Sequence, residues 1–401
     1  MDTSSDTQPQ IIWINAVFIL LTPVLAVGLG AWSLLTQPQT AAPFILAIVL
    51  WWVTGIGITA GYHRLFSHRS YKAAWPLRLF FAIAGAATWQ NHIIAWCSNH
   101  RRHHRFVDTD KDPYNAKRGF WWSHMGWVLY RNPYFEDFSN VKDLIDDPIC
   151  AWQERHYMKI SIAFNVGVPL VAGLLTNNVL GMLLWAGLVR VVLVHHATFL
   201  INSVAHIAGS QPWSRHNTSR DSWWLALLTF GEGYHNYHHA FEADYRNGYK
   251  WYTFDPSKWL IWLFSHIKVT SNLRRIPWDM IEKKRYEERR SVLDSKRTQW
   301  AEWVEEFKAD ISVKATETHT TIQTHLSHVE ARIDERLRDL RSTRTQLQDA
   351  LRNKGTVTRR EIKLLKTQMS QTRHALRASI REWEQLIAQY GTMMDSAAAS
   401  A

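Results

Sequence analysis

The chain has 401 residues, 46% of them hydrophobic, and a formal net charge of +11. This length fits two domains, or one large membrane protein with an extension. The two cysteines, Cys97 and Cys150, exclude a disulfide scaffold and favour a reducing compartment for the soluble parts. The 22 tryptophans favour a membrane–water interface. Since no nucleic-acid-binding motif is recognised, we expect no nucleic-acid partner and assign the positive charge to lipid headgroups or an acidic substrate.

Two apolar stretches without charges follow a short polar tail. The tail, residues 1–10, lacks the basic start of a cleavable signal peptide. Residues 11–35 are long enough to cross the ~30 Å hydrocarbon core, and residues 42–62 predict a second span. Residues 75–96 are apolar but contain several polar side chains, which lipid would not accommodate. We therefore predict one interfacial or protein-buried helix there.

A second pair of spans is predicted at 160–175 and 179–201. The connections within both pairs lack Lys and Arg, whereas residues 63–157 and 206–282 are rich in them. The positive-inside rule then places these two segments, as a cap, and both chain termini in the cytoplasm. The sequence thus predicts an all-α integral membrane domain with four transmembrane helices over residues 11–282, in a bacterial inner membrane.

The composition changes to Arg, Glu, Lys, Gln and Thr from about residue 283. Apolar residues recur at steps of three, four and seven through 322–340 and again through 362–390, with Gly355 between the two runs. This pattern predicts an antiparallel, coiled-coil-like helical hairpin over 283–392. The hairpin either packs on itself, which we favour, or serves as an oligomerisation or partner-docking arm. Residues 393–401 are expected to be disordered.

Three clusters of histidines lie at or beyond the ends of the predicted spans. In residues 100–104 and 235–239 the histidines recur at i, i+3 and i+4, which places them on one face of a helix. Neutral imidazoles that converge in this way indicate metal ligands. His63 and His68 are five residues apart, about 140° around a helix, so both face one site only if the span frays there.

Nine clustered imidazoles suit two metal ions better than one, because a single ion takes about four to six ligands. Imidazole binds Zn, Cu, Fe or Ni, and two redox-active irons would suit oxygen activation. Asn202 lies one helical turn before His206 and could support a metal directly or through water. The predicted metal ligands are His63, His68, His100, His103, His104, Asn202, His206, His235, His238 and His239.

The other histidines are left out of the ligand set. His92, in an apolar stretch, is expected to be buried and hydrogen-bonded. His195 and His196 lie in the fourth span, where at most one of them can face a common centre. Eight more are expected at the surface: His124, His156, His216, His266, His319, His325, His328 and His374.

The order and the residue sequences of these motifs resemble those of the membrane-bound fatty acyl desaturases of the Δ9 (stearoyl-CoA) type. The resemblance covers roughly residues 40–270 and leaves out the C-terminal hairpin. It implies four membrane helices under a cytosolic cap, a kinked tunnel for the acyl chain, and a di-iron enzyme that uses O₂ to form a cis double bond at C9–C10. The matching passages are 57–72 (GITAGYHRLFSHRSYK), 100–104 (HRRHH), 110–115 (DKDPYN), 118–127 (RGFWWSHMGW), 202–206 (NSVAH) and 231–239 (GEGYHNYHH).

The resemblance also implies roles for single residues. The nine histidine positions ligate two irons in that family, and the position of Asn202 contacts one iron through water. Glu232, Asn236 and Asp112 are candidates to orient the ligand rings. Residues carried over as lining the tunnel or its kink are Gln90, Asn91, Trp96, Thr198 and Phe199, with ordinary packing as the alternative for Trp96 and Phe199, and Trp51 is the candidate tunnel floor.

The sequence departs from the animal acyl-CoA desaturases where the CoA head binds. An Arg-Asp pair before the central cluster is replaced by Ser98-Asn99, and a later basic pair is replaced by Arg131-Asn132. Phosphates would then meet Arg131, Arg101, Arg102 and Lys117. We expect a saturated C16 or C18 acyl-CoA as substrate, with acyl carrier protein or a phospholipid as alternative carriers.

The partners implied are the lipid bilayer, O₂ and a separate electron donor. No heme module is recognised, so the donor would be a ferredoxin-like or cytochrome b5-like protein with its reductase, and the basic cap favours an acidic one. Two other functions remain open. A related membrane di-iron hydroxylase or alkane monooxygenase also carries histidine clusters. A metal transporter or scaffold would place its ligands inside the spans, whereas these lie at the span ends.

Overall fold

The computed structural model describes residues 10–131, 137–306, 313–353 and 357–400. The chain divides into two compact units, Met1–Ile276 and Pro277–Ala401, so the division falls slightly before the expected boundary at residue 282. Of the predicted polar tail, residues 1–9 lie outside the described residues.

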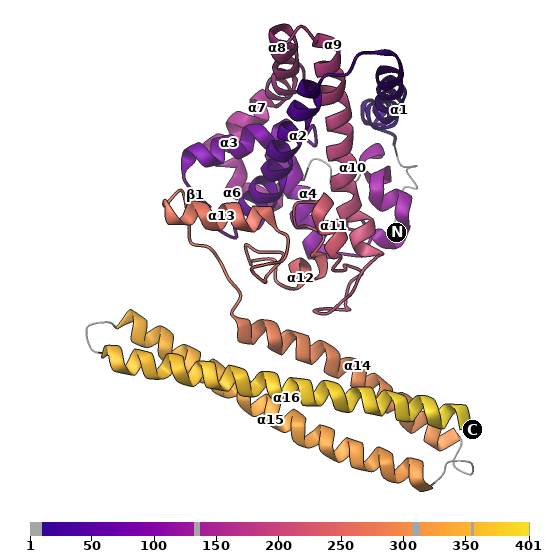
Figure 1. Cartoon of the computed structure of the whole chain (residues 1–401), viewed down its shortest axis with the longest axis vertical. Coiled ribbons are helices and arrows are strands. Elements are labelled where there is room, and N and C mark those ends of the chain that lie inside the picture. Colours follow the sequence, from indigo (N-terminus) through magenta and orange to yellow (C-terminus); the bar gives the residue numbers. More distant parts are fainter. Residues whose placement is uncertain (1–9, 132–136, 307–312, 354–356, 401) are drawn as a thin grey trace, which may run out of the picture. The chain divides into compact units, whose positions relative to one another are not determined.

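The first unit consists almost entirely of helices (Figure 1). Its α-helices are α1 (Trp13–Thr36), α2 (Ala41–Ile56), α3 (Trp75–Ala86), α4 (Ile93–Phe106), α5 (Trp127–Leu129), α6 (Lys142–Ile145), α7 (Pro148–Ile162), α8 (Val168–Leu175), α9 (Val179–Gly181), α10 (Arg190–Asn202), α11 (Trp223–Leu228), α12 (His235–Ala240) and α13 (Pro256–His266). Shorter π-helical or 3₁₀ segments are Gly57–Ser67, Ala116–Arg118, Trp122–Gly126, Ser139–Val141, Ala163–Gly167, Met182–Val189 and Val204–His206. Two short antiparallel strands, β1 (Lys72–Ala73) and β2 (Thr270–Ser271), join the beginning of the cap to its end.

Four continuous helices are long and apolar enough to cross a membrane, as the sequence predicts. They run over Trp13–Thr36, Ala41–Ser67, Pro148–Leu175 and Val179–His206. The second, third and fourth of these helices are longer than the predicted apolar stretches, because helical backbone extends into the polar residues next to them. Figure 1 shows the connection between α8 and α9 at one end of the unit and α4, α11 and α12 towards the other.

The second span ends as a π-helix rather than by fraying. In Gly57–Ser67 the helix widens, and the backbone N–H of His68 donates to the carbonyl of His63 at 3.0 Å. Because a π-helix bonds residue i to residue i+5, two residues five apart lie one above the other. His63 and His68 therefore share one side of the helix, and the expectation that the span must fray is wrong.

The apolar stretch 75–96 forms two helices rather than one. Between α3 and α4 the chain makes a turn in which Trp89 (φ 57°) and Asn91 (φ 86°) have left-handed backbones. The fourth span holds this turn, since Arg190 Nη1 donates to the carbonyl of Ala87 at 3.2 Å and His195 Nε2 donates to that of Thr88 at 2.7 Å. Polar backbone in this turn is thus satisfied by side chains of the spans.

The core of this unit lies where α3 and α4 pack on the π-helical segment, around Tyr62, Phe81 and Ile93. Close approach depends on glycine at two points. Gly85 faces the ring of Tyr62, and Gly55 faces the ring of Phe230, with no room for a β-carbon at either position. Phe230 directly precedes the glycine-rich turn that leads to the last histidine cluster, so Gly55 fixes how that turn meets the second span.

The second unit has three long helices: α14 (Trp278–Glu306), α15 (Val313–Arg352) and α16 (Arg359–Ser400). α15 and α16 form the expected antiparallel hairpin, with Arg332 bonded to Glu382 and His319 to Tyr390. α14, most of which lies within the predicted hairpin range 283–392, is a separate third helix that packs along both. Residues 393–400 continue α16, so the expected disorder of this end is wrong as far as Ser400. The buried side chains spaced along the three helices are Tyr286, Leu293, Leu326, Val329, Ile333, Leu340, Leu376, Trp383 and Tyr390.

The apolar stripes of the hairpin are therefore covered within the unit itself. The heptad residues of the hairpin pack against one another and against α14. This packing agrees with the preferred interpretation that the extension packs on itself.

We expect Gly55→Ala to destabilise the membrane unit by about 1–3 kcal/mol, because the added methyl would overlap the ring of Phe230. Thermal unfolding in detergent measures the effect. Gly28→Ala is the matched control, since a β-carbon there meets no atom within 4 Å. Equal stability of the two variants would contradict the close packing of Gly55 on Phe230.

Candidate metal centre

The nine clustered histidines separate into two groups in the cap. Within each group the ring nitrogens lie within 4.8 Å of one another. Nearest Nε2 atoms are 2.8 Å apart for His68 and His100 and 3.2 Å apart for His206 and His235. The five-histidine group contains His63, His68, His100, His104 and His238, and the four-histidine group contains His103, His206, His235 and His239.

Two short helices supply histidines to both groups. On α4, His100 and His104 are four residues apart and face the five-histidine group, whereas His103 is turned by about 100° and faces the other. On α12, His235 and His239 share one face, and His238 points to the five-histidine group. The remaining members come from the ends of the second and fourth spans.

Acidic side chains orient three of the ligand rings. Glu232 Oε2 lies 2.9 Å from His63 Nδ1, and Asp112 Oδ1 lies 2.9 Å from His103 Nδ1. Glu242 Oε2 lies 3.3 Å from His104 Nδ1. An ionised carboxylate can only accept, so the ring proton sits on Nδ1 and the lone pair of Nε2 faces the group.

A hydroxyl orients a fourth ring. Thr218 Oγ1 donates to Asp108 Oδ1 at 2.7 Å, because the carboxylate can only accept. The same oxygen therefore accepts from His206 Nδ1 at 2.8 Å. The backbone N–H of Thr218 also donates to Asp108, which holds the hydroxyl in place. His206 thus presents the lone pair of Nε2 to the four-histidine group.

Burial disfavours the protonated form of His100, His104, His238 and His239. Burial lowers the pKa of His100, His238 and His239 well below the usual value, and neighbouring imidazoles lower it further. Burial also lowers the pKa of His104 to about 4, although the carboxylate of Glu242 acts in the opposite direction. At neutral pH the rings offer lone pairs, which is the form that binds a metal.

The arrangement fits one metal ion in each group. Two ligands at about 2.1 Å from a common ion, at right angles, lie about 3 Å apart, which is the spacing of the nearest Nε2 atoms here. With protons held on Nδ1, several of these nitrogens cannot donate to one another. A cation between them would receive their lone pairs and offset the cost of burying them unpaired.

Of the three predicted orienting residues, two contact ligand rings and one does not. Glu232 and Asp112 face His63 and His103. Asn236 instead bonds the backbone at Trp213, Ser214 and Ser219, and so holds the loop that carries Thr218. Asn202 is the last residue of α10 and partly buried; the contacts of its side chain with either group remain a prediction.

The predicted tunnel residues lie around the turn between α3 and α4. Gln90 Nε2 donates to Thr198 Oγ1 at 2.9 Å, and Asn91 donates its backbone N–H to Tyr157. Trp96 stacks on His100 with ring centroids 5.0 Å apart. Phe199 is 4% exposed. Since the turn and the fourth span carry these residues, a chain lying along them would pass beside the five-histidine group.

Trp51 and Arg131, two more predicted substrate residues, lie elsewhere. Trp51 lies in the middle of the second span, with its ring 4.5 Å from that of Phe230. Arg131 is exposed, and its backbone N–H donates to the carbonyl of Gln10.

Two of the cations expected at the substrate head are engaged in ion pairs. Arg101 binds both carboxylate oxygens of Asp143, and Arg102, which is 6% exposed, lies 2.9 Å from Asp137. Their expected role as phosphate ligands is therefore not supported. Ser98, at one departure from the animal enzymes, bonds Asn140 and belongs to the same packed region.

Among the other histidines, the structure contradicts the surface position expected for His124, whereas His319 and His92 are of intermediate burial. His124 is 5% exposed rather than at the surface, and bonds Ser203 and His196. His319 is partly buried between Trp300 and Tyr390. His92 is only partly buried. His195 and His196 belong to neither histidine group.

Sequence reasoning missed Glu242, Thr218 and Asp108. Glu242 follows His239 by three residues, and this position near the last histidine cluster could have identified it as a residue that orients a ligand ring. Thr218 is twelve residues from His206 in a loop without periodicity, and its contact with Asp108 spans 110 residues. No local pattern in the sequence predicts that contact.

The described residues thus contain four helices long and apolar enough to cross a membrane and two histidine groups that could each hold a metal ion, as in a membrane protein that binds metal. The family model for fatty acid desaturases matches residues 38–270. The chain belongs to the fatty acid desaturase family.

Three relatives illustrate the match. A probable acyl-CoA desaturase of Schizosaccharomyces pombe is 44% identical over 70% of this chain and 58% of its own length. Acyl-CoA desaturase 1 of Saccharomyces cerevisiae is 41% identical over 71% and 56%, so the chain spans less than two thirds of either yeast protein. An sn-1 stearoyl-lipid 9-desaturase of Anabaena variabilis is 34% identical over 68% and 98%. With both yeast and cyanobacterial relatives, the comparisons do not support the bacterial membrane expected from the sequence.

We expect Thr218→Val to weaken metal binding in the four-histidine group by about 10–100-fold, because His206 loses the oxygen that orients it. Metal analysis of the purified protein should show about half the metal of the unchanged chain. Thr218→Ser keeps the hydroxyl and is the matched control. Equal metal content in the Val and Ser variants would contradict the role of the hydroxyl.

Proposed function

We propose that the chain is an O₂-dependent fatty acyl desaturase that forms a cis double bond at C9–C10 of a saturated C16 or C18 acyl chain. The observation that carries the proposal is the pair of buried histidine groups beside the turn at Gln90 and Asn91. Membership of the desaturase family and the names of the relatives support the same activity.

We propose two irons as the metal ions, one for each histidine group, with Asn202 completing the four-histidine group directly or through water. Groups made only of imidazole nitrogens are able to bind iron, and membership of the desaturase family supports iron as the metal. Two bound irons would supply, with O₂ and two electrons, the oxidising power needed to remove two hydrogens from an unactivated chain.

The residues of the chain have to position the substrate, because neighbouring methylene groups are chemically alike. In the proposed tunnel for the acyl chain, Gln90 and Thr198 form one wall through their hydrogen bond, and Trp96 stacks on the ring of His100. Phe199 adds a buried apolar ring on the fourth span, with its centroid 5.9 Å from that of His195. Exclusion of water by this packing protects the reacting carbons from side reactions.

We propose acyl-CoA as the substrate. Two yeast relatives are named for acyl-CoA, whereas the cyanobacterial relative is named for a lipid substrate. Lys117 and Arg131 are exposed cations of the cap, and the head of the substrate would meet them. Acyl carrier protein and phospholipid are the alternative carriers, which an assay with each purified substrate separates.

Electrons would come from a separate ferredoxin-like or cytochrome b5-like donor and its reductase. The cap and both termini would lie in the cytoplasm, since the cap segments carry the basic residues. A net charge of +11 favours an acidic donor.

Expression in a host that lacks unsaturated-fatty-acid synthesis is expected to produce a new monoene with its double bond at C9–C10, read from the fatty-acid profile. His103→Ala should abolish it, because the four-histidine group loses a member. His374→Ala, an exposed histidine of the second unit, is the matched control and should retain it. A hydroxylated acyl chain in place of the monoene would favour the hydroxylase alternative.

We also expect Trp51→Ala to shift the products towards longer chains, because a large ring in the middle of the second span is removed. Gas chromatography of the products from mixed C16, C18 and C20 substrates measures the shift. An unchanged chain-length profile in a variant of normal stability would rule out Trp51 as the tunnel floor.

A further inference from the structure

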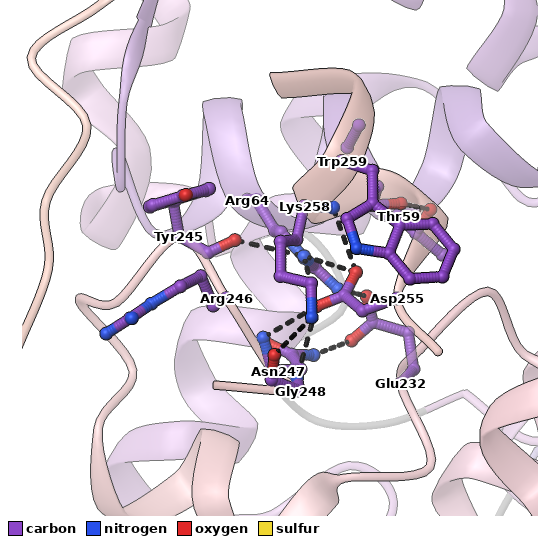
Figure 2. A network of polar contacts seen from close by, with 12 residues as sticks. Thr59, Arg64, Glu232, Tyr245, Arg246, Asn247, Gly248, Asp255, Lys258 and Trp259 are labelled. Atoms are coloured by element: carbon purple, nitrogen blue, oxygen red, sulfur yellow. Dashed lines mark hydrogen bonds and ion pairs between the residues drawn. The ribbon is translucent and has the colours of Figure 1, made fainter. Parts of the chain in front are cut away.

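A chain of buried charges lies next to His63. Figure 2 shows its members, Glu232, Arg64 and Asp255. Glu232, which faces His63, also accepts from Arg64 Nη2 at 2.9 Å. The other terminal nitrogen of Arg64 lies 2.9 and 3.0 Å from the two carboxylate oxygens of Asp255. All three charged side chains are at most 2% exposed. The guanidinium is therefore shared between two carboxylates that lie far apart in the sequence.

Asp255 is held by the backbone around it. Its Oδ2 accepts from the backbone N–H groups of Asn247 at 2.9 Å and Gly248 at 3.1 Å. Its Oδ1 accepts from the backbone N–H of Lys258 at 2.9 Å, which caps the beginning of α13. With three donors and a guanidinium around it, the carboxylate has little freedom to move.

Lys258 closes the loop that contains these donors. Its Nζ donates to the backbone carbonyls of Gly248 and Lys250 at 2.6 Å and of Thr253 at 2.9 Å. Burial lowers the pKa of Lys258 to about 8. The loop also reaches Glu232 directly, through a hydrogen bond from Asn247 Nδ2. The segment 247–258 thus forms a rigid holder for the acidic partner of Arg64 and for Glu232.

The position of Glu232 depends on how Arg64 is shared. With Asp255 in place, Arg64 offers one terminal nitrogen to each carboxylate. Arg64 Nη1 also donates to the backbone carbonyl of Tyr245 at 2.9 Å. Without the charge of Asp255, Glu232 is the one acid left on the guanidinium, so the guanidinium is drawn towards Glu232 and shifts its carboxylate. That movement would take Glu232 Oε2 from the ring of His63.

We propose that Asp255 is a positioning residue for the five-histidine group, which acts through Arg64 and Glu232 on the orientation of His63. The inference rests on the metal centre of the proposed function. Asp255 itself contacts no histidine of either group; it controls one ligand ring from two residues away. The four-histidine group, oriented by Asp112 and Thr218, does not depend on it.

The test is a titration of the metal-stripped full chain in detergent with Zn²⁺, in competition with a chelating dye. We expect two sites in the unchanged chain. In Asp255→Asn one site should weaken by about 10–100-fold while the other keeps its affinity. Glu232→Gln should weaken the same site, and the double variant should be no worse than the stronger single effect, because both act on one ring.

Asp244→Asn is the matched control. Asp244 is 1% exposed and pairs with Arg246, and its further contacts are with Tyr237 and the backbone of Ile276. Two unchanged sites in this variant support the inference. Equal weakening in Asp244→Asn, or loss of both sites in Asp255→Asn, would show general destabilisation and overturn it.

The outcomes also separate this inference from the proposed function. Two sites in the unchanged chain and two unchanged sites in Asp255→Asn overturn the role of Asp255 alone. Fewer than two sites in the unchanged chain overturn the two-metal centre, and this inference with it.

Discussion

Nine buried or half-buried imidazoles gathered into two groups are the constraint on which the rest of this structure depends. Nearest ring nitrogens lie about 3 Å apart in a buried region. Such a group is unfavourable unless each ring is held in one tautomer and one orientation. The carboxylates of Glu232, Asp112 and Glu242 and the hydroxyl of Thr218 do this for four rings. Much of the polar interior of the cap therefore serves to fix the histidines.

The spans contribute more than an anchor in the membrane. The π-helical end of the second span brings His63 and His68 to one side. The fourth span holds the turn between α3 and α4 through Arg190 and His195. The third span adds Tyr157, which accepts from the backbone of Asn91. The wall of the proposed tunnel is thus built from segments of the membrane domain that are separate in sequence.

How much could be predicted from the sequence depended on whether the signal was local. The spans and the i, i+3, i+4 histidines follow from composition and helical periodicity, which act over a few residues. The π-helix at His63 and the turn at Trp89 could not be derived in that way, because tertiary packing overrides the ordinary helix there. Thr218 and Asp108 meet across 110 residues. In the extension beyond Pro277, α14 buries Tyr286, Leu293 and Trp300 at steps of seven residues, a pattern that the prediction of a two-helix hairpin did not use.

The sharing of α4 and α12 between the two groups has a consequence for how this family can vary. Insertion of one residue between His100 and His103 would rotate everything after it by about 100° and send His103 and His104 towards the wrong partners. The same holds between His235 and His238. Selection would thus remove insertions and deletions in these two helices, whereas substitutions on their outer faces would be tolerated. Diversity of chain length should accumulate in the loops outside them.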